Sequence, residues 1–261
     1  VKGASEPAVW CGRAPPRKVF VMASADAGKT WDRPREISDT VRQPNWTWYA
    51  TGPGRGIQLT KGPHRGRLIV PCDHVVTLKQ PQKWLLGWSV TRFDLRSHII
   101  FSDNGGWSWQ LGGDGPPSTN ECQVAESSEG MLMLNMRDFS GRGLRRQAIS
   151  CDDGLEITDL GYNRALIEPL PAGCQASIIT TRRNEVMLFT GASDPKRSRR
   201  HLKLRWSLDS GVTWPWELSI YPGPAAYSCL EITGSQDSEV AVLFEAGAEG
   251  EDPYGSIALW R

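Results

Sequence analysis

The stretch SLDSGVTW (residues 207–214) occurs in four versions along this 261-residue chain, and its repetition decides the fold. Residues 24–31 read SADAGKTW, residues 102–109 read SDNGGWSW, and a weaker version, SCDDGLEI, occupies residues 150–157. Asp and Gly in such a pattern are typical of tight turns, because the carboxylate accepts backbone hydrogen bonds and Gly adopts a positive φ. The Trp that ends three of the versions carries a large apolar surface, which we expect to pack between neighbouring sheets.

Pairs of short apolar segments, each pair joined by a polar turn, repeat in phase with these turns. The pairs begin at Cys122 (CQVAESSEGMLMLNMR), Cys174 (CQASIITTRRNEVMLFTG) and Ser228 (SCLEITGSQDSEVAVLFEAG). Segments of this length and composition predict β-strands, and no amphipathic helix longer than three turns is visible. A repeat of roughly 40–50 residues with several strands predicts the blades of a β-propeller. The alternative, a large β-sandwich, would require the strand pairs and the Trp turns to repeat together by chance.

The composition restricts the classes of partner. The net charge is +1, whereas a protein that binds nucleic acid normally carries a basic surplus, so we expect no nucleic-acid partner. No apolar run reaches the length of a membrane span. The six cysteines include no CxxC pair, so we expect buried free thiols on strands and no metal site.

Charged or reactive residues on the first two strands of a repeat are candidates for a functional site, because the innermost strands of a propeller face its channel. Glu121 precedes one first strand, and Arg137 ends the second strand of the same repeat. Tyr227 and Glu245 hold the corresponding places in the last repeat, and Arg199 precedes HLKLRWS in another. Taken singly, each residue also fits a structural role, as an edge charge, a strand end or a buried tyrosine.

Together, these residue types indicate a particular chemistry. Converging arginines bind a carboxylate, and a Glu beside a Tyr can accept the phenol proton, which makes the Tyr a nucleophile. A Tyr nucleophile distinguishes sialidases from other retaining glycosidases.

The chain resembles the exo-sialidase (neuraminidase) family of the bacterial and lysosomal type, a six-bladed β-propeller marked by turns called Asp boxes. The four turns resemble those boxes, and the resemblance extends from about Val19 to the last residues. The segments that resemble the family beyond the boxes are WYATGPGRGIQL (48–59), NECQVAE (120–126), RHLKLRWSLDSGVTW (200–214) and GPAAYSCLE (223–231). The resemblance implies an all-β, six-bladed propeller of which this chain covers roughly the last four to five blades. It also implies a single sialidase-like domain over residues 1–261 that is incomplete at its N-terminus.

The resemblance also implies an activity, the removal of terminal α-linked sialic acids from glycoconjugates with retention of configuration and without a cofactor. Tyr227 looks like the nucleophile and Glu121 like its base partner. Arg137 and Arg199 look like the second and third of three arginines that bind the sialic acid carboxylate. Glu245 is similar to the Glu that orients the first arginine. Trans-sialylation, the same chemistry with a sugar acceptor, is not distinguished from hydrolysis.

Two parts of the family pattern do not occur in the sequence, the Arg-Ile-Pro-type motif of the first arginine and the acid/base Asp. GRAPPRK (12–18) contains Arg-x-Pro but lies too close to the first Asp box. We therefore expect either a fragment or a shortened propeller, weak or inactive as written. Two non-enzymatic alternatives stay open, a propeller that binds sialoglycans through Arg137 and Arg199, and a protein-interaction propeller.

Further residues are candidates at lower specificity. Trp48 and Tyr49 lie in a loop expected at a channel mouth, where they would contact the sugar, but aromatic packing between blades explains them equally well. Asp73 and His74 end another inner strand and are candidate pocket residues. Arg200 is the nearest competitor of Arg199. The expected partners are sialylated glycoproteins, glycolipids and oligosaccharides, and a secreted, periplasmic or lysosomal-like compartment is expected for the parent protein.

Overall fold

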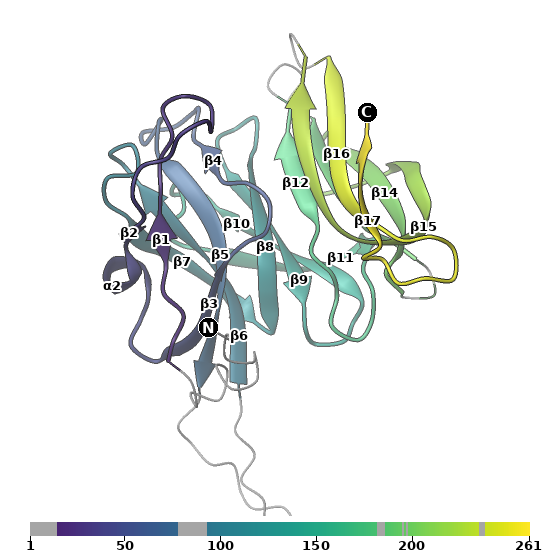
Figure 1. Ribbon diagram of the computed structural model, residues 1–261, viewed down its shortest axis with the longest axis horizontal. Coiled ribbons are helices and arrows are strands. Elements are labelled where there is room, and N and C mark those ends of the chain that lie inside the picture. The colour runs from purple at the N-terminus through teal and green to yellow at the C-terminus, as the bar shows by residue number, and fades with distance from the viewer. Residues whose placement is uncertain (1–14, 78–92, 182–185, 195, 197, 235–237) are drawn as a thin grey trace, which may run out of the picture.

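The computed structural model describes residues 15–77, 93–181, 186–194, 196, 198–234 and 238–261. Within these ranges the regular secondary structure consists almost wholly of antiparallel β-strands, and the one helix is the single turn α2 (Ser38–Val41). The sheets stand beside one another in Figure 1, from the purple N-terminal strands on the left to the yellow C-terminal strands on the right. The predicted all-β fold is confirmed.

The strands follow one another in space in the order of the sequence, as in the blades of a propeller. A two-stranded sheet contains β1 (Phe20–Val21) and β2 (Arg35–Glu36). A second sheet contains β3 (Trp46–Thr51), β5 (Leu68–Thr77), β6 (Phe93–Ser102) and β7 (Gln110–Pro117), with β4 (Ile57–Gln58) paired to β5. A third contains β8 (Thr119–Glu126), β9 (Leu132–Asp138), β10 (Leu144–Ser150) and β11 (Thr158–Ile167). The last contains β12 (Ser177–Thr180), β13 (Met187–Ala192), β14 (Arg200–Ser207), β15 (Trp216–Thr233), β16 (Glu239–Ala246) and β17 (Ser256–Trp260).

The strand β15 belongs to two blades at once. Residues 216–224 pair with β14, whereas residues 225–233 pair with β16. The outer strand of one blade therefore continues directly into the inner strand of the next. The described sheets thus comprise three four-stranded blades and parts of two others, which is the portion of a propeller that the sequence predicts.

The hydrophobic core lies between successive sheets. Ile69 and Ile99 of the second sheet pack with Leu134 of the third, and Met133 of the third packs with Phe189 of the fourth. All of these side chains are buried. Because each blade buries its faces against its neighbours, the inner strands of different blades are held at fixed positions around the channel.

The Asp boxes are turns that connect the third strand of a blade to its fourth. In the version at 207–214, Asp209 accepts hydrogen bonds from the Thr213 amide (2.8 Å) and the Ser207 hydroxyl (2.6 Å), and Gly211 has a φ of +88°. Trp214 donates from Nε1 to the Gly211 carbonyl (3.0 Å). The carboxylate therefore accepts hydrogen bonds within its own turn, as the sequence predicts.

The burial of the terminal tryptophans differs between the boxes. Trp109 and Trp214 are buried between sheets, at 7% and 3% exposure, as expected. Trp31 is 57% exposed, so the expectation of packing between sheets is wrong for this residue in the described structure. Trp31 keeps the same bond within the turn, from Nε1 to the Gly28 carbonyl (3.1 Å), because that bond depends on the turn and not on a neighbouring sheet.

The cysteines are free thiols wherever the structure describes them. Cys72, Cys122 and Cys174 are buried, Cys229 is partly buried, and Cys151 is exposed because it lies in an Asp-box turn and not on a strand. The expectation of buried thiols on strands is therefore wrong for Cys151, and Cys174 is buried but lies before β12 and not on a strand. Cys11 and residues 12–14 of GRAPPRK lie outside the described residues.

Candidate functional site

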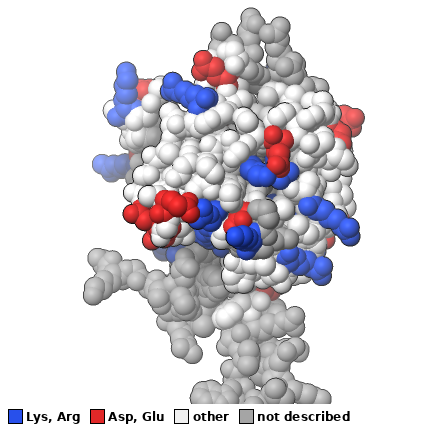
Figure 2. Space-filling view, turned by 90° about the vertical axis from the view of Figure 1, so that its right-hand side faces the viewer, with Lys and Arg blue, Asp and Glu red and all other residues white. Residues whose placement is uncertain are grey.

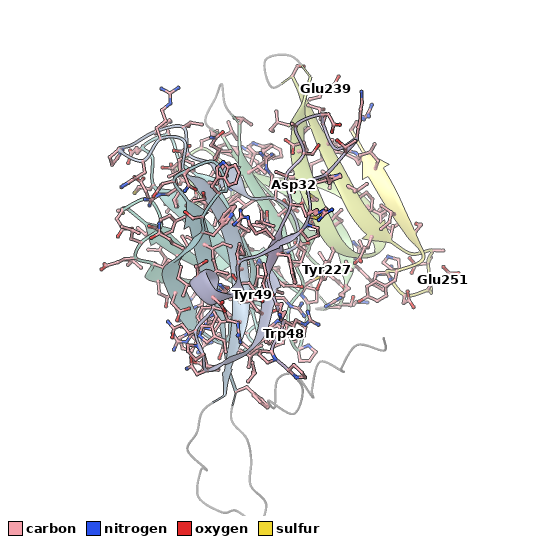
Figure 3. All side chains as sticks on the ribbon, turned by 60° about the vertical axis from the view of Figure 1, so that its left-hand side comes forward. Asp32, Trp48, Tyr49, Tyr227, Glu239 and Glu251 are labelled. Atoms are coloured by element: carbon pink, nitrogen blue, oxygen red, sulfur yellow. The ribbon has the colours of Figure 1, made fainter. Side chains whose placement is uncertain are left out.

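The candidate residues occupy one edge of the blades, and the Asp boxes occupy the opposite edge. A meander places the start of its first strand, the end of its second and the start of its third at one edge. The candidate residues that lie at such positions are Glu121, Arg137, Arg199, Tyr227 and Glu245. Each Asp box, in contrast, follows the end of a third strand. In Figure 3, Trp48, Tyr49 and Tyr227 lie in the lower half of the view and Glu239 lies at the top.

Tyr227 forms a hydrogen-bonded group with Glu121 and Arg137, although it comes from a different blade from these two residues. The Tyr227 hydroxyl donates to Glu121 Oε1, and Arg137 Nη1 donates to Glu121 Oε2 at 2.7 Å. Arg137 Nη1 also lies 3.4 Å from the Tyr227 hydroxyl oxygen. Arg137 Nε donates to the Ala172 carbonyl (2.7 Å), which fixes the plane of the guanidinium. The carboxylate of Glu121 is therefore shared between a phenol and a guanidinium.

Arg199 lies next to this group, over the ring of Tyr227. Its guanidinium carbon lies 5.8 Å from the centre of the Tyr227 ring. Its Nη1 donates to the Tyr254 hydroxyl (2.5 Å), on the turn before β17. Arg200, the competitor, instead forms an ion pair with Glu249 at 2.7 Å. Of the two arginines, Arg199 is therefore the one that lies beside Tyr227.

Glu245 supports the backbone of Tyr227. Its Oε2 accepts a hydrogen bond from the Tyr227 amide at 3.0 Å. Burial raises the pKa of the Tyr227 phenol well above its usual value, and the charge and hydrogen bond of Glu121 raise it further against the opposing charge of Arg137. Burial lowers the pKa of Arg137, but the charge and hydrogen bond of Glu121 outweigh it and the net change is upward. At neutral pH the resting group thus contains a neutral phenol and a charged guanidinium.

Asp73 and Trp48 lie in a buried polar arrangement next to this group. Asp73 Oδ2 accepts hydrogen bonds from Trp48 Nε1 (2.9 Å) and Asn120 Nδ2 (3.0 Å), and Asn120 directly precedes Glu121. Burial raises the pKa of Asp73 to about 7, with a further contribution from the charge of Glu121. The guanidinium of Arg17 lies 3.5 Å from the centre of the Trp48 ring.

Tyr49 and His74 lie inside the blade. The expected loop at Trp48 and Tyr49 is wrong, because both lie on β3, and the expected strand end at Asp73 and His74 is wrong, because β5 continues to Thr77. The Tyr49 hydroxyl donates to Cys72 Sγ (3.4 Å). His74 stacks on Trp46 at 3.5 Å between ring centres and lies 3.0 Å, between Nδ1 atoms, from His98. Burial lowers the pKa of His74 to about 3. For Tyr49 and His74, this geometry favours the packing interpretation over direct contact with a sugar.

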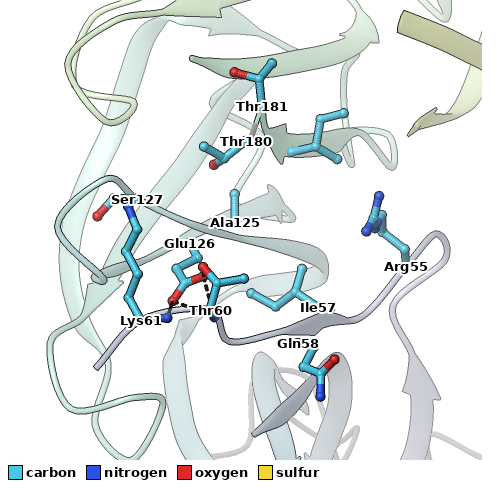
Figure 4. Close-up of a pocket in the computed structure, with 11 residues that line it drawn as sticks. Arg55, Ile57, Gln58, Thr60, Lys61, Ala125, Glu126, Ser127, Thr180 and Thr181 are labelled. Atoms are coloured by element: carbon cyan, nitrogen blue, oxygen red, sulfur yellow. Dashed lines mark hydrogen bonds between the residues drawn. The ribbon is translucent and has the colours of Figure 1, made fainter. Parts of the chain in front are cut away.

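The cavities do not by themselves identify the site. A hollow of about 170 Å³ borders Tyr227 and Glu245 and is lined mainly by apolar atoms. The larger cavity, of about 560 Å³, lies at the Asp-box edge between Lys61, Glu126 and Thr180 (Figure 4). The Glu126 carboxylate in this cavity already accepts hydrogen bonds from the amides of Thr60 and Lys61. The larger of the two cavities is therefore not the one beside Tyr227, and the site is identified by its chemistry.

Three observations on the described residues concern metal ions, membranes and surface charge. In the described part of the chain, no cluster of three or more His, Cys, Asp or Glu residues has the arrangement of a metal site. None of the described helices has the length and apolar character that crossing a membrane requires. On the face shown in Figure 2, acidic and basic side chains are interspersed.

Sequence reasoning did not identify several neighbours of the site. Asn120 directly precedes Glu121 in NECQVAE, so the sequence could have indicated that it lies next to the site. Arg17 and Tyr254 lie in irregular segments whose sequences carry no periodicity, and nothing in the pattern places them beside Trp48 and Arg199.

Known proteins similar to this chain share its repeats and its fold. The BNR repeat-like domain matches residues 4–242. A sialidase of Bacteroides fragilis (strain YCH46) is 31% identical over 239 residues, which cover 88% of this chain and 39% of that protein. A sialidase of Micromonospora viridifaciens is 32% identical over 235 residues, which cover 87% of this chain and 33% of that protein. The chain therefore spans less than half the length of these two relatives.

Solved structures of sialidases and of a trans-sialidase are also similar to this chain. The Hadza microbial sialidase Hz136 superposes with a TM-score of 0.74 at 30% identity, over 90% of this chain and 44% of that one. The leech intramolecular trans-sialidase superposes with a TM-score of 0.69 over 87% of this chain and 33% of that one, but its 19% identity supports the fold alone. These neighbours support the propeller architecture.

Proposed function

The chain belongs to the sialidase family with BNR repeats, and we propose that it carries the nucleophilic half of a retaining exo-sialidase site. The observation that supports this most is the Tyr227 hydroxyl donating to Glu121, with Arg137 beside that hydroxyl and Arg199 over the ring. The substrate is a terminal α-linked sialic acid on a glycoprotein, glycolipid or oligosaccharide. The reaction requires no metal and no organic cofactor.

In the proposed first step, the Tyr227 oxygen forms a bond to the anomeric carbon as the glycosidic bond breaks. The phenol proton passes to Glu121, the acceptor of its hydrogen bond, and the electron pair of the broken bond leaves with the aglycone. Because the pKa of Tyr227 is raised, a phenolate would not form before substrate arrives. Water then attacks the anomeric carbon from the opposite side as its bond to the Tyr227 oxygen breaks, and two inversions retain the configuration. Glu121 returns its proton to the Tyr227 oxygen, and the proton lost by water neutralises the aglycone.

The two arginines are proposed to hold the substrate carboxylate. Arg137 and Arg199 approach Tyr227 from different blades, so an anion between them would lie next to the nucleophile. A carboxylate nucleophile would be repelled by the substrate's own carboxylate, whereas a neutral phenol is not. This electrostatic difference is the physical reason for a Tyr at this position.

An aryl sialoside tests this proposal independently of protonation of the leaving group. The 4-methylumbelliferyl leaving group departs as a stable phenolate and needs little general-acid assistance. We expect the protein to release fluorophore and Tyr227→Phe to lose at least about 100-fold in kcat/KM. Tyr221→Phe is the matched control. Tyr221 lies on the same strand as Tyr227 but outside the site, and its hydroxyl donates to the Gly247 carbonyl (2.7 Å).

The outcomes distinguish the candidate functions. Equal turnover by the parent and Tyr227→Phe would overturn the Tyr mechanism. Binding of sialyllactose without turnover would favour a glycan-binding propeller, and no response to either ligand would favour an interaction propeller. Product analysis with lactose as acceptor separates hydrolysis from trans-sialylation.

A further inference from the structure

We propose that Gln123 and Gln175, joined through the Pro53 carbonyl, are positioning residues that hold Tyr227 opposite Glu121. This arrangement of Pro53, Gln123 and Gln175 is called the Pro53 bridge below. Its significance for catalysis rests on the proposed function, whereas its effect on the geometry of Tyr227 does not.

Two glutamines in equivalent positions of the repeats converge on one carbonyl oxygen. Gln123 Nε2 donates to the Pro53 carbonyl at 2.9 Å, and Gln175 Nε2 donates to the same oxygen at 3.0 Å. Each Gln directly follows the Cys that begins its repeat, at Cys122 and Cys174. Both side chains are buried, where a lost hydrogen bond leaves a polar group without water.

Gln175 connects this carbonyl directly to the strand of the proposed nucleophile. Its Oε1 accepts a hydrogen bond from the Ser228 amide (2.8 Å), and its Nε2 lies 2.9 Å from the Ser228 carbonyl oxygen and 3.1 Å from that of Ala176. Ser228 directly follows Tyr227, whose own amide is bonded to Glu245. The backbone around Tyr227 is therefore fixed on both sides, on one of them by Gln175.

Gln123 connects the same carbonyl to the strand of Glu121, two residues away on β8. The strands β8 and β15 do not pair with each other, because they belong to different sheets. No ladder of backbone hydrogen bonds therefore sets the separation of Glu121 and Tyr227. The Pro53 bridge provides a directional polar connection across that separation.

The loop that presents Pro53 fits closely between these strands. Gly54 has a φ of +126°, and a Cβ at this position would lie 2.6 Å from Gln123 Nε2. A Cβ at Gly52 would lie 2.5 Å from the Cys122 carbonyl oxygen. At the far end of the loop, Arg55 forms an ion pair with Glu231 of β15 at 2.7 Å. The loop is thus anchored to both strands that carry the Tyr–Glu pair.

A fluorine label at Tyr227 tests the positioning role without requiring turnover. We place 3-fluorotyrosine at position 227 of the full chain and follow its ¹⁹F signal as a function of pH. Burial and Glu121 raise the pKa of this phenol, while Arg137 opposes them and Arg199, Glu245 and Cys174 also lie nearby. In Gln175→Met and Gln123→Met we expect the titration midpoint to fall by roughly one pH unit or more, because the phenol moves away from Glu121 and towards water.

Gln147→Met is the matched control, because Gln147 is also a buried glutamine but bonds to the Gly211 carbonyl (3.2 Å) at the Asp-box edge. It should lower stability and leave the ¹⁹F titration unchanged. Unchanged titration in folded Gln123→Met and Gln175→Met would overturn the proposal. If either variant fails to fold, Gly54→Ala provides a second test, because its Cβ displaces the loop away from Gln123. It should produce the same fall in the titration midpoint, and an unchanged midpoint in Gly54→Ala would also overturn the proposal.

The aryl sialoside assay separates this inference from the proposed function. With an active parent, the bridge variants should lose roughly 10- to 100-fold in kcat with little change in KM, because Arg137 and Arg199 are untouched. A rise in KM alone would contradict positioning of the nucleophile. A parent without turnover, combined with the expected ¹⁹F shifts, would overturn the proposed function and leave the bridge supported.

Discussion

The carboxyl of Asp73 changes its charge state near neutral pH. Its carboxyl is 1% exposed, and its Oδ2 accepts two hydrogen bonds. Burial, followed by the charge of Glu121, raises its pKa from 3.8 to about 7. Between these two values the folded protein holds a proton on Asp73 that the unfolded chain has lost, so the contribution of Asp73 to stability falls as the pH rises from about 4 to 7.

We therefore expect Asp73→Asn to be more stable than the parent at pH 8 by roughly 2–4 kcal/mol, and the difference to shrink towards pH 5. Asn keeps the shape of the side chain and an oxygen that accepts from Trp48 and Asn120, but it cannot ionise. Urea unfolding at the two pH values measures this difference. The exposed Asp39→Asn should show no comparable trend, and a constant difference for Asp73→Asn would contradict the raised pKa.

For single residues, the sequence predicted the arrangement of the reactive residues better than that of their neighbours. Glu121 and Tyr227 could be paired in advance because they occupy equivalent places in two repeats. The contact of Arg17 with Trp48 and that of Tyr254 with Arg199 could not, since both depend on irregular segments whose path follows from packing and not from periodicity.

Among the elements, β10 contributes a buried ion pair close to the site. Arg145 donates from Nη1 to Glu168 (2.9 Å) and to the Cys174 carbonyl (2.5 Å), and from Nε to Asn135 (2.7 Å). The other Glu168 oxygen accepts from the amide of Asp138, next to Arg137. The pair therefore ties β9, β10 and the segment before β12 together where Arg137 emerges.

Arg145→Met should lower the free energy of unfolding by about 3–5 kcal/mol, because it leaves the Glu168 carboxylate buried without its cation. Arg146→Met is the matched control on the same strand. Arg146 pairs with the more exposed Asp159 at 2.6 Å, and its loss should cost about 1 kcal/mol or less. Chemical denaturation of both variants measures the two costs, and similar values would contradict the role assigned to burial.

The strands show where sequence patterns are reliable and where they are not. The apolar segments that became β5, β9, β13 and β16 were visible as runs of Val, Ile, Leu and Met. The strand β11 was not predicted, because six of its ten residues are polar or glycine and most of it is not buried. The continuity of β15 across two blades was also missed, since the proline and glycine at 222–224 read as a break.

For the whole molecule, the Asp boxes stabilise the stacking of blades only where their tryptophan is covered. Trp214 and Trp31 make the same hydrogen bond within the same kind of turn, yet one is 3% exposed and the other 57%. The turn geometry followed from the repeated sequence. The burial did not, because it depends on which sheet lies opposite. That residues 1–261 belong to one propeller domain stays a prediction.

This pair of tryptophans provides a controlled comparison. Trp214→Ala should lower the free energy of unfolding by about 3–5 kcal/mol, because it leaves a cavity against Phe189, whose ring centre is 5.9 Å away. Trp31→Ala loses the same hydrogen bond but little burial and should cost less than about 1 kcal/mol. Thermal or urea unfolding of both variants measures the contrast. Equal losses would mean that the turn itself, and not the packing between blades, is what the tryptophan stabilises.

Covalent trapping shows whether Tyr227 is the nucleophile of a sialidase site. A sialosyl fluoride that carries fluorine at C3 forms the glycosyl–enzyme bond without a general acid and releases it slowly, so the labelled residue can be located by peptide mass spectrometry. The account predicts a single sialosyl adduct on the peptide that contains Tyr227, and its absence in Tyr227→Phe. An adduct on another residue, or labelling that persists undiminished in Tyr227→Phe, would contradict it.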